Sequence, residues 1–363
     1  MDMGEKVKVL KLESTIKHYN VPVYNIINRK YDLTVLYYEE SSDSAIEDCE
    51  FKTIYMPFKK VSKLTVLKAN ISRICKDYDV VIAVDSINIW NYFSLAFKPH
   101  KFKLIYWGIG APASYTRHYG EAGKLYYAIS DSMEKCADAL IFYAQEAIDL
   151  HSKRKFKGPK MFVAHNTTTV LKREIKPEIK DSIMFIGSLY LEKGLQILLD
   201  AYKAAYEEDN TIVKLNLVGG GKPLPMIKEW VKVNNLDKVI SVLGPIYDNE
   251  TKAALFQKTL VCISPLQGGL SVLESMGYGV PYVTDANAIT GGEAFNIEDG
   301  INGLRVERMN VSKLKDIILD ISSNKQKYIE MGNNAYVHYW SCRKPEDMAQ
   351  GVIDAIEYVL SEL

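Results

Sequence analysis

The sequence predicts an α/β protein built from two Rossmann-like domains in series. Three observations lead to this prediction. The chain has 363 residues, too many for one ordinary hydrophobic core. Short apolar runs alternate with longer amphipathic stretches along the whole chain, the pattern of βαβ units and parallel sheets. The alternation stops between Asn166 and Pro177, where Thr-rich and then Lys- and Pro-rich sequence predicts a hinge near 165–180.

Each half is expected to supply its own sheet. In the first half, strands are expected at 7–10, 33–38, 80–84, 103–107, 139–143 and 161–163, and helices at 62–76, 121–136 and 144–153. In the second half, strands are expected at 182–186, 213–218, 239–243, 260–264 and 281–284, and helices at 193–206, 222–234, 248–257 and 270–276. The tail, about 345–363, has one apolar helical face that could cover either domain, formed by Met348, Val352, Ile353, Ile356, Val359 and Leu360.

Composition narrows the class of protein. Hydrophobic residues make up 47% and charged residues 25%, which is typical of a soluble globular protein. No apolar run approaches the ~18–20 residues of a membrane span, and the first residues lack the apolar core of a signal peptide. The five cysteines are odd in number and form no Cys-x-x-Cys pair, so neither a disulfide framework nor a zinc site is expected. A cytoplasmic location fits these features.

The charge is unevenly distributed although the net charge is zero. Residues 1–180 carry 28 Lys or Arg against 21 Asp or Glu, and the remainder carries 17 against 24. A basic half rich in tyrosine could attract a membrane surface or an anionic acceptor. An ordinary solvated surface explains the same numbers, and both interpretations stay open here.

The first chemical motif joins a strand to a helix. Gly187 ends the strand, and Lys193-Gly194 opens the helix within Phe185-Ile-Gly-Ser-Leu-Tyr-Leu-Glu-Lys-Gly194. Ligands bind at such strand-to-helix turns in parallel sheets, and a helix N-terminus beside a lysine suits a phosphate. The alternative is a surface lysine at an ordinary turn.

The second motif is a run of three glycines after a strand, in Leu217-Val-Gly219-Gly220-Gly221. Glycines allow a close backbone approach and positive φ. The run does not complete the Gly-x-Gly-x-x-Gly dinucleotide fingerprint, so an NAD-dependent dehydrogenase is disfavoured. A tight turn is the simpler explanation.

The third motif carries the strongest signal. A glycine pair, Gly268-Gly269, opens a short helix that holds Glu274, within the segment Ser264-Pro-Leu-Gln-Gly-Gly-Leu-Ser-Val-Leu-Glu274-Ser-Met-Gly-Tyr-Gly279-Val-Pro281. Free amides at the helix start could hold a diphosphate, and the carboxylate could accept hydrogen bonds from a ribose diol. A solvated glutamate on a short helix is the alternative.

The order and spacing of these motifs resemble the C-terminal domain of GT-B glycosyltransferases of the retaining type, family 4. The resemblance extends from Gly187 through Gly303 and includes Leu243-Gly-Pro-Ile246 and Asp299-Gly-Ile-Asn-Gly303. It is looser in the first half. The resemblance implies two Rossmann-like domains facing a central cleft. Residues 1–170 would bind the acceptor, 171–342 would bind the nucleotide-sugar donor, and a C-terminal helix at about 343–363 would pack back on the first domain.

The resemblance also implies roles for individual residues. Lys193 would neutralise the leaving diphosphate. Gly268 and Gly269 would present backbone amides to the donor phosphate and sugar. Glu274 would bind the ribose hydroxyls, and Ile246 lies where the family holds the base. The donor site as a whole is expected at Gly187, Ser188, Lys193, Gly220, Ile246, Gly268, Gly269, Leu270 and Glu274.

Two departures from the family pattern affect this site. Ser188 stands where the family has an arginine, so one of two cations on the diphosphate is missing. Leu266 stands where the family has the first Glu of a Glu pair, which normally contacts the donor sugar. Because of these two departures, an alternative function stays open. The protein could be a catalytically weak relative of the family that binds a sugar nucleotide or serves as a partner subunit.

Acceptor groups are expected from the first half. The glycine- and proline-containing loop after 103–107 carries Arg117 and His118, and His118 is a candidate catalytic group. His18 and Tyr19 follow the first expected strand. For each of these residues an ordinary surface loop is the alternative. Asp77-Tyr-Asp79 spells the Asp-x-Asp of metal-dependent transferases, but it precedes the strand at 80–84 and is expected to be a turn.

The resemblance implies a reaction that transfers a hexose from a UDP- or GDP-sugar to an acceptor hydroxyl. Metal and cofactor are not expected, because protein groups hold the diphosphate in this family, and nothing indicates nucleic acid. A surface polysaccharide or glycolipid would be the product, formed in the cytoplasm or at the inner face of the membrane. An epimerase or phosphorylase on the same frame is a further alternative, although no acid/base pair for an epimerase is identifiable.

Overall fold

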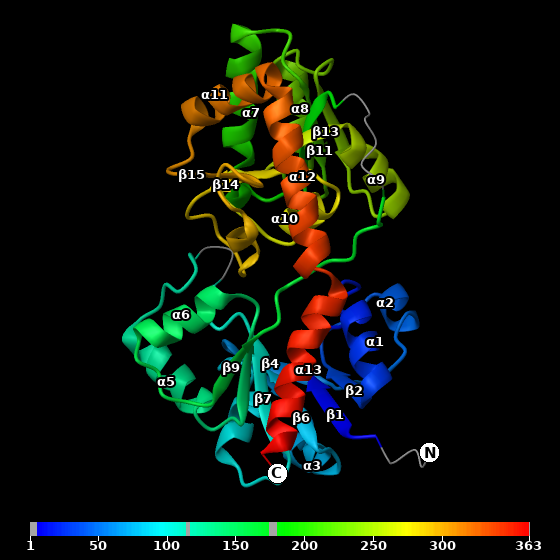
Figure 1. Cartoon of the computed structure of the whole chain (residues 1–363), viewed down its shortest axis with the longest axis vertical. Coiled ribbons are helices and arrows are strands. Elements are labelled where there is room, and N and C mark those ends of the chain that lie inside the picture. Colours follow the sequence, from blue (N-terminus) through cyan, green and yellow to red (C-terminus); the bar gives the residue numbers. More distant parts are fainter. Residues whose placement is uncertain (1–5, 114–116, 174–179, 363) are drawn as a thin grey trace. The chain divides into compact units, whose positions relative to one another are not determined.

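The computed structural model describes residues 6–113, 117–173 and 180–362 (Figure 1). Residues 174–179 of the expected hinge lie outside the described residues. The chain splits into two compact units. Unit 1 comprises Met1–Pro112, Gly120–Thr168 and Lys344–Leu363, and unit 2 comprises Ala113–Tyr119 and Thr169–Arg343.

Unit 1 contains a parallel sheet of seven strands in the order β3-β2-β1-β6-β7-β8-β9. The strands are β1 (Lys8–Leu12), β2 (Asp32–Tyr37), β3 (Lys52–Tyr55), β6 (Val80–Val84), β7 (Lys103–Gly108), β8 (Ala139–Phe142) and β9 (Lys160–Val163). Short helices and a hairpin fill the connections: α1 (Val21–Lys30), α2 (Asp43–Glu47), β4 (Phe58–Val61), β5 (Leu64–Leu67), α3 (Ile71–Ile74), α4 (Trp90–Phe93), α5 (Lys124–Glu134) and α6 (Gln145–Lys153). The strands β6 and β8 are apolar throughout because both faces of the sheet are covered.

The tail forms α13 (Pro345–Ser361), which belongs to unit 1 and packs against α1 and the strands β7 to β9 (Figure 1). Its face of Met348, Val352, Ile353, Ile356 and Val359 is buried in the same core as α1. Gly351 brings the helix onto β9 so closely that a Cβ there would lie 2.4 Å from the Val163 carbonyl oxygen. The tail is therefore part of the core of this unit.

Unit 2 contains a parallel sheet of six strands in the order β12-β11-β10-β13-β14-β15. The strands are β10 (Ser182–Ile186), β11 (Lys214–Val218), β12 (Ile240–Gly244), β13 (Thr259–Ile263), β14 (Tyr282–Asp285) and β15 (Gly303–Val306). The helices are α7 (Leu195–Glu208), α8 (Leu224–Val233), α9 (Asn249–Lys258), α10 (Ser271–Gly277), α11 (Val311–Ser323) and α12 (Lys325–Cys342). Counted within the unit, the strand order is 3-2-1-4-5-6, the Rossmann order, and it reverses between β10 and β13.

The prediction of an α/β fold with two Rossmann-like sheets is confirmed, but the helix expected at 62–76 is wrong. Leu64–Leu67 is strand β5, paired antiparallel with β4. The helical part of the segment is limited to the short α3 and the 3₁₀ helix Cys75–Asp77 that follows it. Thr65 and Leu67 face the core while Leu64 is exposed, so the segment alternates as a strand does. Asn70 starts α3, since its Oδ1 accepts a hydrogen bond from the Arg73 amide at 3.1 Å.

The Asp77-Tyr-Asp79 motif lies at the entry to β6, as expected. Asp79 Oδ2 accepts the Lys8 amide at 2.8 Å and so ties the start of β6 to β1. Among the described helices, none is long and apolar enough to cross a membrane.

Candidate functional site

The carboxyl edge of the unit 2 sheet brings together three glycine-containing loops. The Gly187 amide donates to the Val218 carbonyl at 3.0 Å, the Gly219 amide donates to the Gly244 carbonyl at 2.8 Å, and the Leu189 amide donates to the Gly220 carbonyl at 2.8 Å. The loops after β10, β11 and β12 are thus joined by backbone hydrogen bonds. This edge lies beside the point where the strand order reverses, which is where open α/β sheets bind ligands.

The glycines of the second motif are required by this close packing. A Cβ on Gly219 would lie 1.9 Å from the Gly187 carbonyl oxygen, and a Cβ on Gly221 would lie 2.1 Å from the Leu189 carbonyl oxygen. Both glycines have positive φ, at 150° and 155°. Gly220 meets only ordinary contacts with Pro245. The tight-turn interpretation therefore accounts for Gly219 and Gly221 without a ligand.

Lys193 ends the short 3₁₀ helix Leu191–Lys193 and turns its ammonium group back toward Gly187. A Cβ on Gly187 would lie 2.8 Å from Lys193 Nζ, and this atom lies 5.5 Å from the Phe185 ring centre and 5.2 Å from the Tyr190 ring centre. No carboxylate of the described residues forms an ion pair with it. Burial lowers the pKa of Lys193 to about 8. The side chain is a partly desolvated cation at a ligand-binding edge.

The loop after β13 holds Lys193 in place. The Leu266 amide donates to the Lys193 carbonyl at 3.2 Å, and a Cβ on Gly194 would lie 2.8 Å from Leu266 Cγ. Leu266 thus packs against the turn that carries Lys193. The Tyr190 hydroxyl donates to Gln267 Oε1, which adds a second link between the same two loops. The resemblance implied a carboxylate at this position; in the structure, the Leu266 side chain packs against Gly194.

Gly268 and Gly269, the two glycines before α10, differ in how closely other residues pack around them. The Gly268 amide donates to the Ile289 carbonyl at 3.0 Å, and a Cβ there would lie 2.9 Å from Ala294 Cβ. In this structure, the Gly268 amide is therefore not free to hold a phosphate as the resemblance implied. Gly269 has nothing within 4 Å of its Cβ position, and it is followed by Leu270, the residue before α10. Open space lies next to Gly269, and the amides of Gly269 and Leu270 donate no backbone hydrogen bond to a described residue.

Glu274 forms an ion pair, contrary to the alternative of a solvated glutamate. Its Oε1 lies 2.7 Å from Lys252 Nζ, and the side chains of Glu274 and Lys252 are only 15% and 17% exposed. The pair joins α9 to α10. Lys252 had no role in the sequence analysis, because the pairing depends on how two helices lie against each other. Ser188 is exposed and Ile246 is half-buried against the core.

The candidate acceptor residues fall in both units. His18 and Tyr19 follow β1 in unit 1, and their rings meet edge to face at 5.5 Å. Arg117 and His118 were expected in the first domain, but residues 113–119 belong to unit 2. There His118 Nδ1 donates to the Asn287 carbonyl oxygen at 2.7 Å, and Arg117 is exposed. The earlier part of that loop, residues 114–116, lies outside the described residues.

Asp85 is a candidate that the sequence analysis missed. It follows β6 at the carboxyl edge of the unit 1 sheet, next to the point where that strand order reverses. A Cβ on Gly108 would lie 2.8 Å from Asp85 Cβ, so Gly108 leaves room for the carboxylate. Burial raises the pKa of Asp85 well above its usual value; Glu134 raises it further and Arg154 opposes the shift. An acidic residue directly after a buried strand was the available signal.

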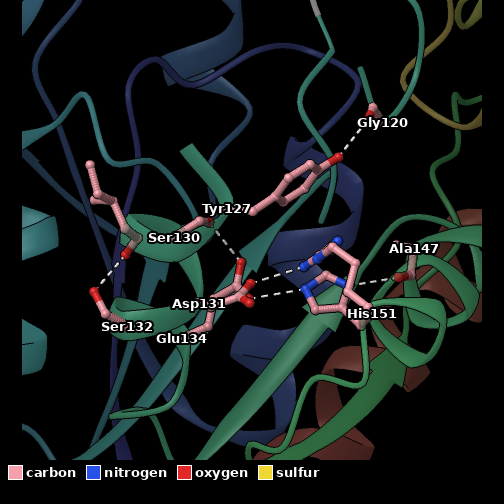
Figure 2. A network of polar contacts seen from close by, with 10 residues as sticks. Gly120, Tyr127, Ser130, Asp131, Ser132, Glu134, Ala147 and His151 are labelled. Carbon is pink, nitrogen blue, oxygen red and sulfur yellow. Dashed lines mark hydrogen bonds and ion pairs between the residues drawn. The ribbon is translucent and has the colours of Figure 1, made fainter. Parts of the chain in front are cut away.

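Unit 1 also contains a buried polar network between α5 and α6 (Figure 2). His151 Nε2 lies 3.0 Å from Glu134 Oε2, and His151 Nδ1 donates to the Ala147 carbonyl at 2.7 Å. Arg154 Nη2 donates to Asp131 Oδ1 at 3.0 Å, and its guanidinium lies 4.2 Å from the Tyr127 ring centre.

The ligand atoms of Asp131, Glu134 and His151 lie within 4.8 Å of one another, as in a metal site. Each of these three side chains forms a hydrogen bond or ion pair with another protein group. We therefore interpret the network as one that holds α5 and α6 together.

Comparisons with known proteins agree with this geometry. Residues 180–324 match the family model described as Glycosyl transferases group 1. An uncharacterized glycosyltransferase of Methanocaldococcus jannaschii is 29% identical over 154 residues, 42% of this chain and 41% of that protein. The chain thus matches about two fifths of the length of this curated relative.

Solved structures extend the likeness to the whole chain. HepE of Anabaena, crystallised with UDP, has a TM-score of 0.72 at 16% identity and covers 97% of this chain and 100% of its own. TarM of S. aureus has a TM-score of 0.69 at 11% identity and covers 96% and 99%. Sucrose-phosphate synthase of Thermosynechococcus elongatus has a TM-score of 0.68 at 14% identity and covers 98% and 100%. The chain therefore has the GT-B fold.

Proposed function

We propose that the protein is a glycosyltransferase that transfers a hexose from a UDP- or GDP-sugar to an acceptor hydroxyl. The observation that carries this proposal is Lys193, a partly desolvated cation without a carboxylate partner among the described residues, at the carboxyl edge of a sheet of Rossmann order. The match of residues 180–324 to group 1 glycosyl transferases supports it. The UDP complex of HepE supports the same donor class.

The chemistry requires that the negative charge on the departing diphosphate be stabilised. Lys193 supplies a cation, and the backbone amides of Gly269 and Leu270 supply hydrogen-bond donors in a fixed arrangement. Glu274, oriented by Lys252, would accept hydrogen bonds from the ribose hydroxyls. The backbone at Ile246 would hold the base. The proposal needs no metal, since protein groups take the diphosphate, and it includes retention of the anomeric configuration.

The acceptor hydroxyl must be bound and oriented by separate groups. His18, Tyr19, Arg117 and His118 are proposed for this role, with His118 next to the reacting hydroxyl. Asp85 joins them because it is a carboxylate at the ligand-binding edge of the unit 1 sheet. Its raised pKa favours the protonated carboxyl group, which can donate a hydrogen bond to a hydroxyl.

We also propose a role in the synthesis of a surface polysaccharide or glycolipid, in the cytoplasm or peripherally at the inner face of the membrane. The excess of basic residues in 1–180 supports this location, since the cytoplasmic leaflet is anionic.

One observation favours a second candidate function. Leu266 packs against Gly194 where the resembling family places a carboxylate on the donor sugar. A protein with this change could bind a sugar nucleotide without turning it over, as a partner subunit.

The deciding experiment is a thermal-shift screen of UDP, GDP, ADP and CMP and their sugars, followed by hydrolysis assays on each hit. Stabilisation by UDP or GDP with slow hydrolysis of the matching sugar is the expected result. Stabilisation without hydrolysis or transfer supports the binding subunit, and no stabilisation by any nucleotide refutes the donor site.

A further inference from the structure

Large apolar side chains are exposed on the β4–β5 hairpin of unit 1 and on the neighbouring segment that contains α4. Val61 and Leu64 face each other across the tip of the β4–β5 hairpin and are 50% and 37% exposed. Trp90 and Phe97 are 50% and 52% exposed. Exposure of this size at neighbouring positions indicates a binding surface, because single scattered apolar residues are the usual surface pattern.

The hairpin and the segment that carries Trp90 are directly joined. The Thr65 amide donates to the Asn88 carbonyl at 2.8 Å, and Thr65 forms an isolated parallel bridge with Ile89, the residue before Trp90. From Trp90, ring contacts continue to Phe93 at 6.0 Å and from Phe93 to Phe97 at 5.2 Å. These segments form one continuous surface.

The fold does not need the exposed side chains for its core. Along β5, Thr65 and Leu67 are buried and Leu67 packs in the unit 1 core, while Leu64 is exposed. Val61 is the register partner of Leu64 at the end of the pair. The apolar tip is therefore available to a partner outside the chain.

Lysines surround the apolar side chains. Lys59, Lys63, Lys68 and Lys98 are exposed, and none of them forms an ion pair with a described residue. Lys60 lies 3.9 Å from Glu39. We name the set of Val61, Leu64, Trp90 and Phe97 with Lys59, Lys63, Lys68 and Lys98 the hairpin patch.

The two sequence segments that form the hairpin patch contain no acidic residues. Residues 51–76 contain seven Lys or Arg and no Asp or Glu, and residues 86–112 contain three Lys and no Asp or Glu. Residues 1–50 instead contain six Lys or Arg and ten Asp or Glu. The basic excess of the first half is therefore concentrated in the segments that build this surface.

We propose that the hairpin patch docks on an anionic membrane surface. The lysines would contact lipid phosphates, and Trp90 with the apolar tip would enter the boundary between headgroups and acyl chains. Trp and flanking lysines are the side chains that favour this boundary. A soluble polyanion would engage the lysines but would leave Val61, Leu64 and Trp90 in water, so the membrane satisfies both parts of the surface. The inference rests on the membrane contact in the proposed function and concerns unit 1 alone.

The test is co-sedimentation of the full chain with phosphatidylcholine vesicles that contain about one third phosphatidylglycerol, at low and high salt. Binding at low salt that weakens with salt is expected. Trp90 is the most exposed of the four tryptophans, so its emission should shift to shorter wavelength on binding. UDP-induced thermal stabilisation, measured on the same samples, reports the donor site separately.

Two pairs of variants locate the contact. L64S/W90S removes the apolar part and K59Q/K63Q removes charge, and each should weaken vesicle binding by about tenfold or more. The matched controls are L125S, at an exposed apolar position on α5, and K153Q/K157Q, at exposed lysines of the same unit. The controls should bind like the wild type, and all variants should keep the wild-type thermal midpoint.

Three results would overturn the proposal. The first is no binding to anionic vesicles by a protein that still responds to UDP. The second is equal loss in K153Q/K157Q and K59Q/K63Q, which would mean attraction by the whole basic half. The third is unchanged binding by L64S/W90S, or retention on a heparin column without vesicle binding, which would mean a purely electrostatic partner.

Discussion

Lys252 on α9 and Glu274 on α10 form a partly buried ion pair, with Nζ and Oε1 2.7 Å apart. The pair fixes the orientation of the carboxylate proposed to bind ribose, so the role of Glu274 depends on a residue 22 positions earlier in the chain.

The first prediction follows from this pair. E274Q should weaken UDP binding by roughly tenfold, because hydrogen bonds to a charged group are worth about 1.5–3 kcal/mol. K252M should also weaken binding, since it leaves Glu274 without its orienting partner. Calorimetric titration measures both, with E229Q on the exposed face of α8 as the control. Wild-type affinity in E274Q would remove the ribose assignment.

The second prediction concerns pH and Lys193. Because burial lowers its pKa to about 8, the ammonium group is charged at pH 7 and loses its charge as the pH rises through 8. UDP affinity of the wild type should therefore fall roughly tenfold between pH 7 and pH 9. K193A should bind more weakly at pH 7 and show no such fall.

The control for this prediction is K228A, which changes an exposed lysine on α8 and should retain the wild-type profile. A pH dependence that persists in K193A would assign the titration to another group and contradict the leaving-group role.

The third prediction separates the two glycines before α10. G268A should destabilise the protein by about 1–3 kcal/mol, because its Cβ would lie 2.9 Å from Ala294 Cβ. G269A has space for a Cβ and should leave stability unchanged, yet it should weaken donor binding if ligand approaches this backbone. Urea unfolding and UDP titration on the same variants distinguish the two effects. Full donor binding by G269A would argue against a donor contact at this residue.

The fourth prediction concerns the His151–Glu134 pair, whose side chains are 0% and 3% exposed. H151A should lower the free energy of unfolding by about 3–5 kcal/mol, since it leaves a buried carboxylate without its partner. R29A, which removes an exposed pair with Glu50, should change it little. The H151A/E134A double variant should lose less than the two single variants together. Additive losses would mean that the two side chains contribute independently.

The sequence predicted strands best where burial is complete. β10 was placed at the right residues because Ser182–Ile186 is buried throughout and ends at a glycine. The helix expected at 62–76 failed because Leu64, Leu67, Ile71 and Ile74 recur at helical spacing although a hairpin and a short helix share them. The sequence analysis did not anticipate α11, α12 and β15 in unit 2, or α1, α2, β3, β4 and α4 in unit 1.

The motifs of the candidate site could be predicted from the sequence, but the ion pairs and hydrogen bonds between distant segments could not. Glycine and lysine at the end of β10 are local signals, so Lys193 could be identified from sequence. The Lys252–Glu274 pair and the engagement of the Gly268 amide by Ile289 depend on contacts between segments distant in the chain. Asp85 was missed because one acidic residue after a strand is a weak signal by itself. Glu134 and Arg154, which influence its pKa, are brought near it only by the fold.

The position of α13 sets an order of events during synthesis. Residues up to Thr168 leave the ribosome long before Pro345 is made, and at about 5–20 residues per second the interval is roughly 10 to 35 seconds. Throughout that time the site that later receives Met348, Val352 and Ile356 is uncovered. Unit 2 has all its strands earlier, so the second half of the chain can complete its fold before the first. We therefore expect any need for a chaperone to fall in this interval, while the apolar surface of the first half waits for α13.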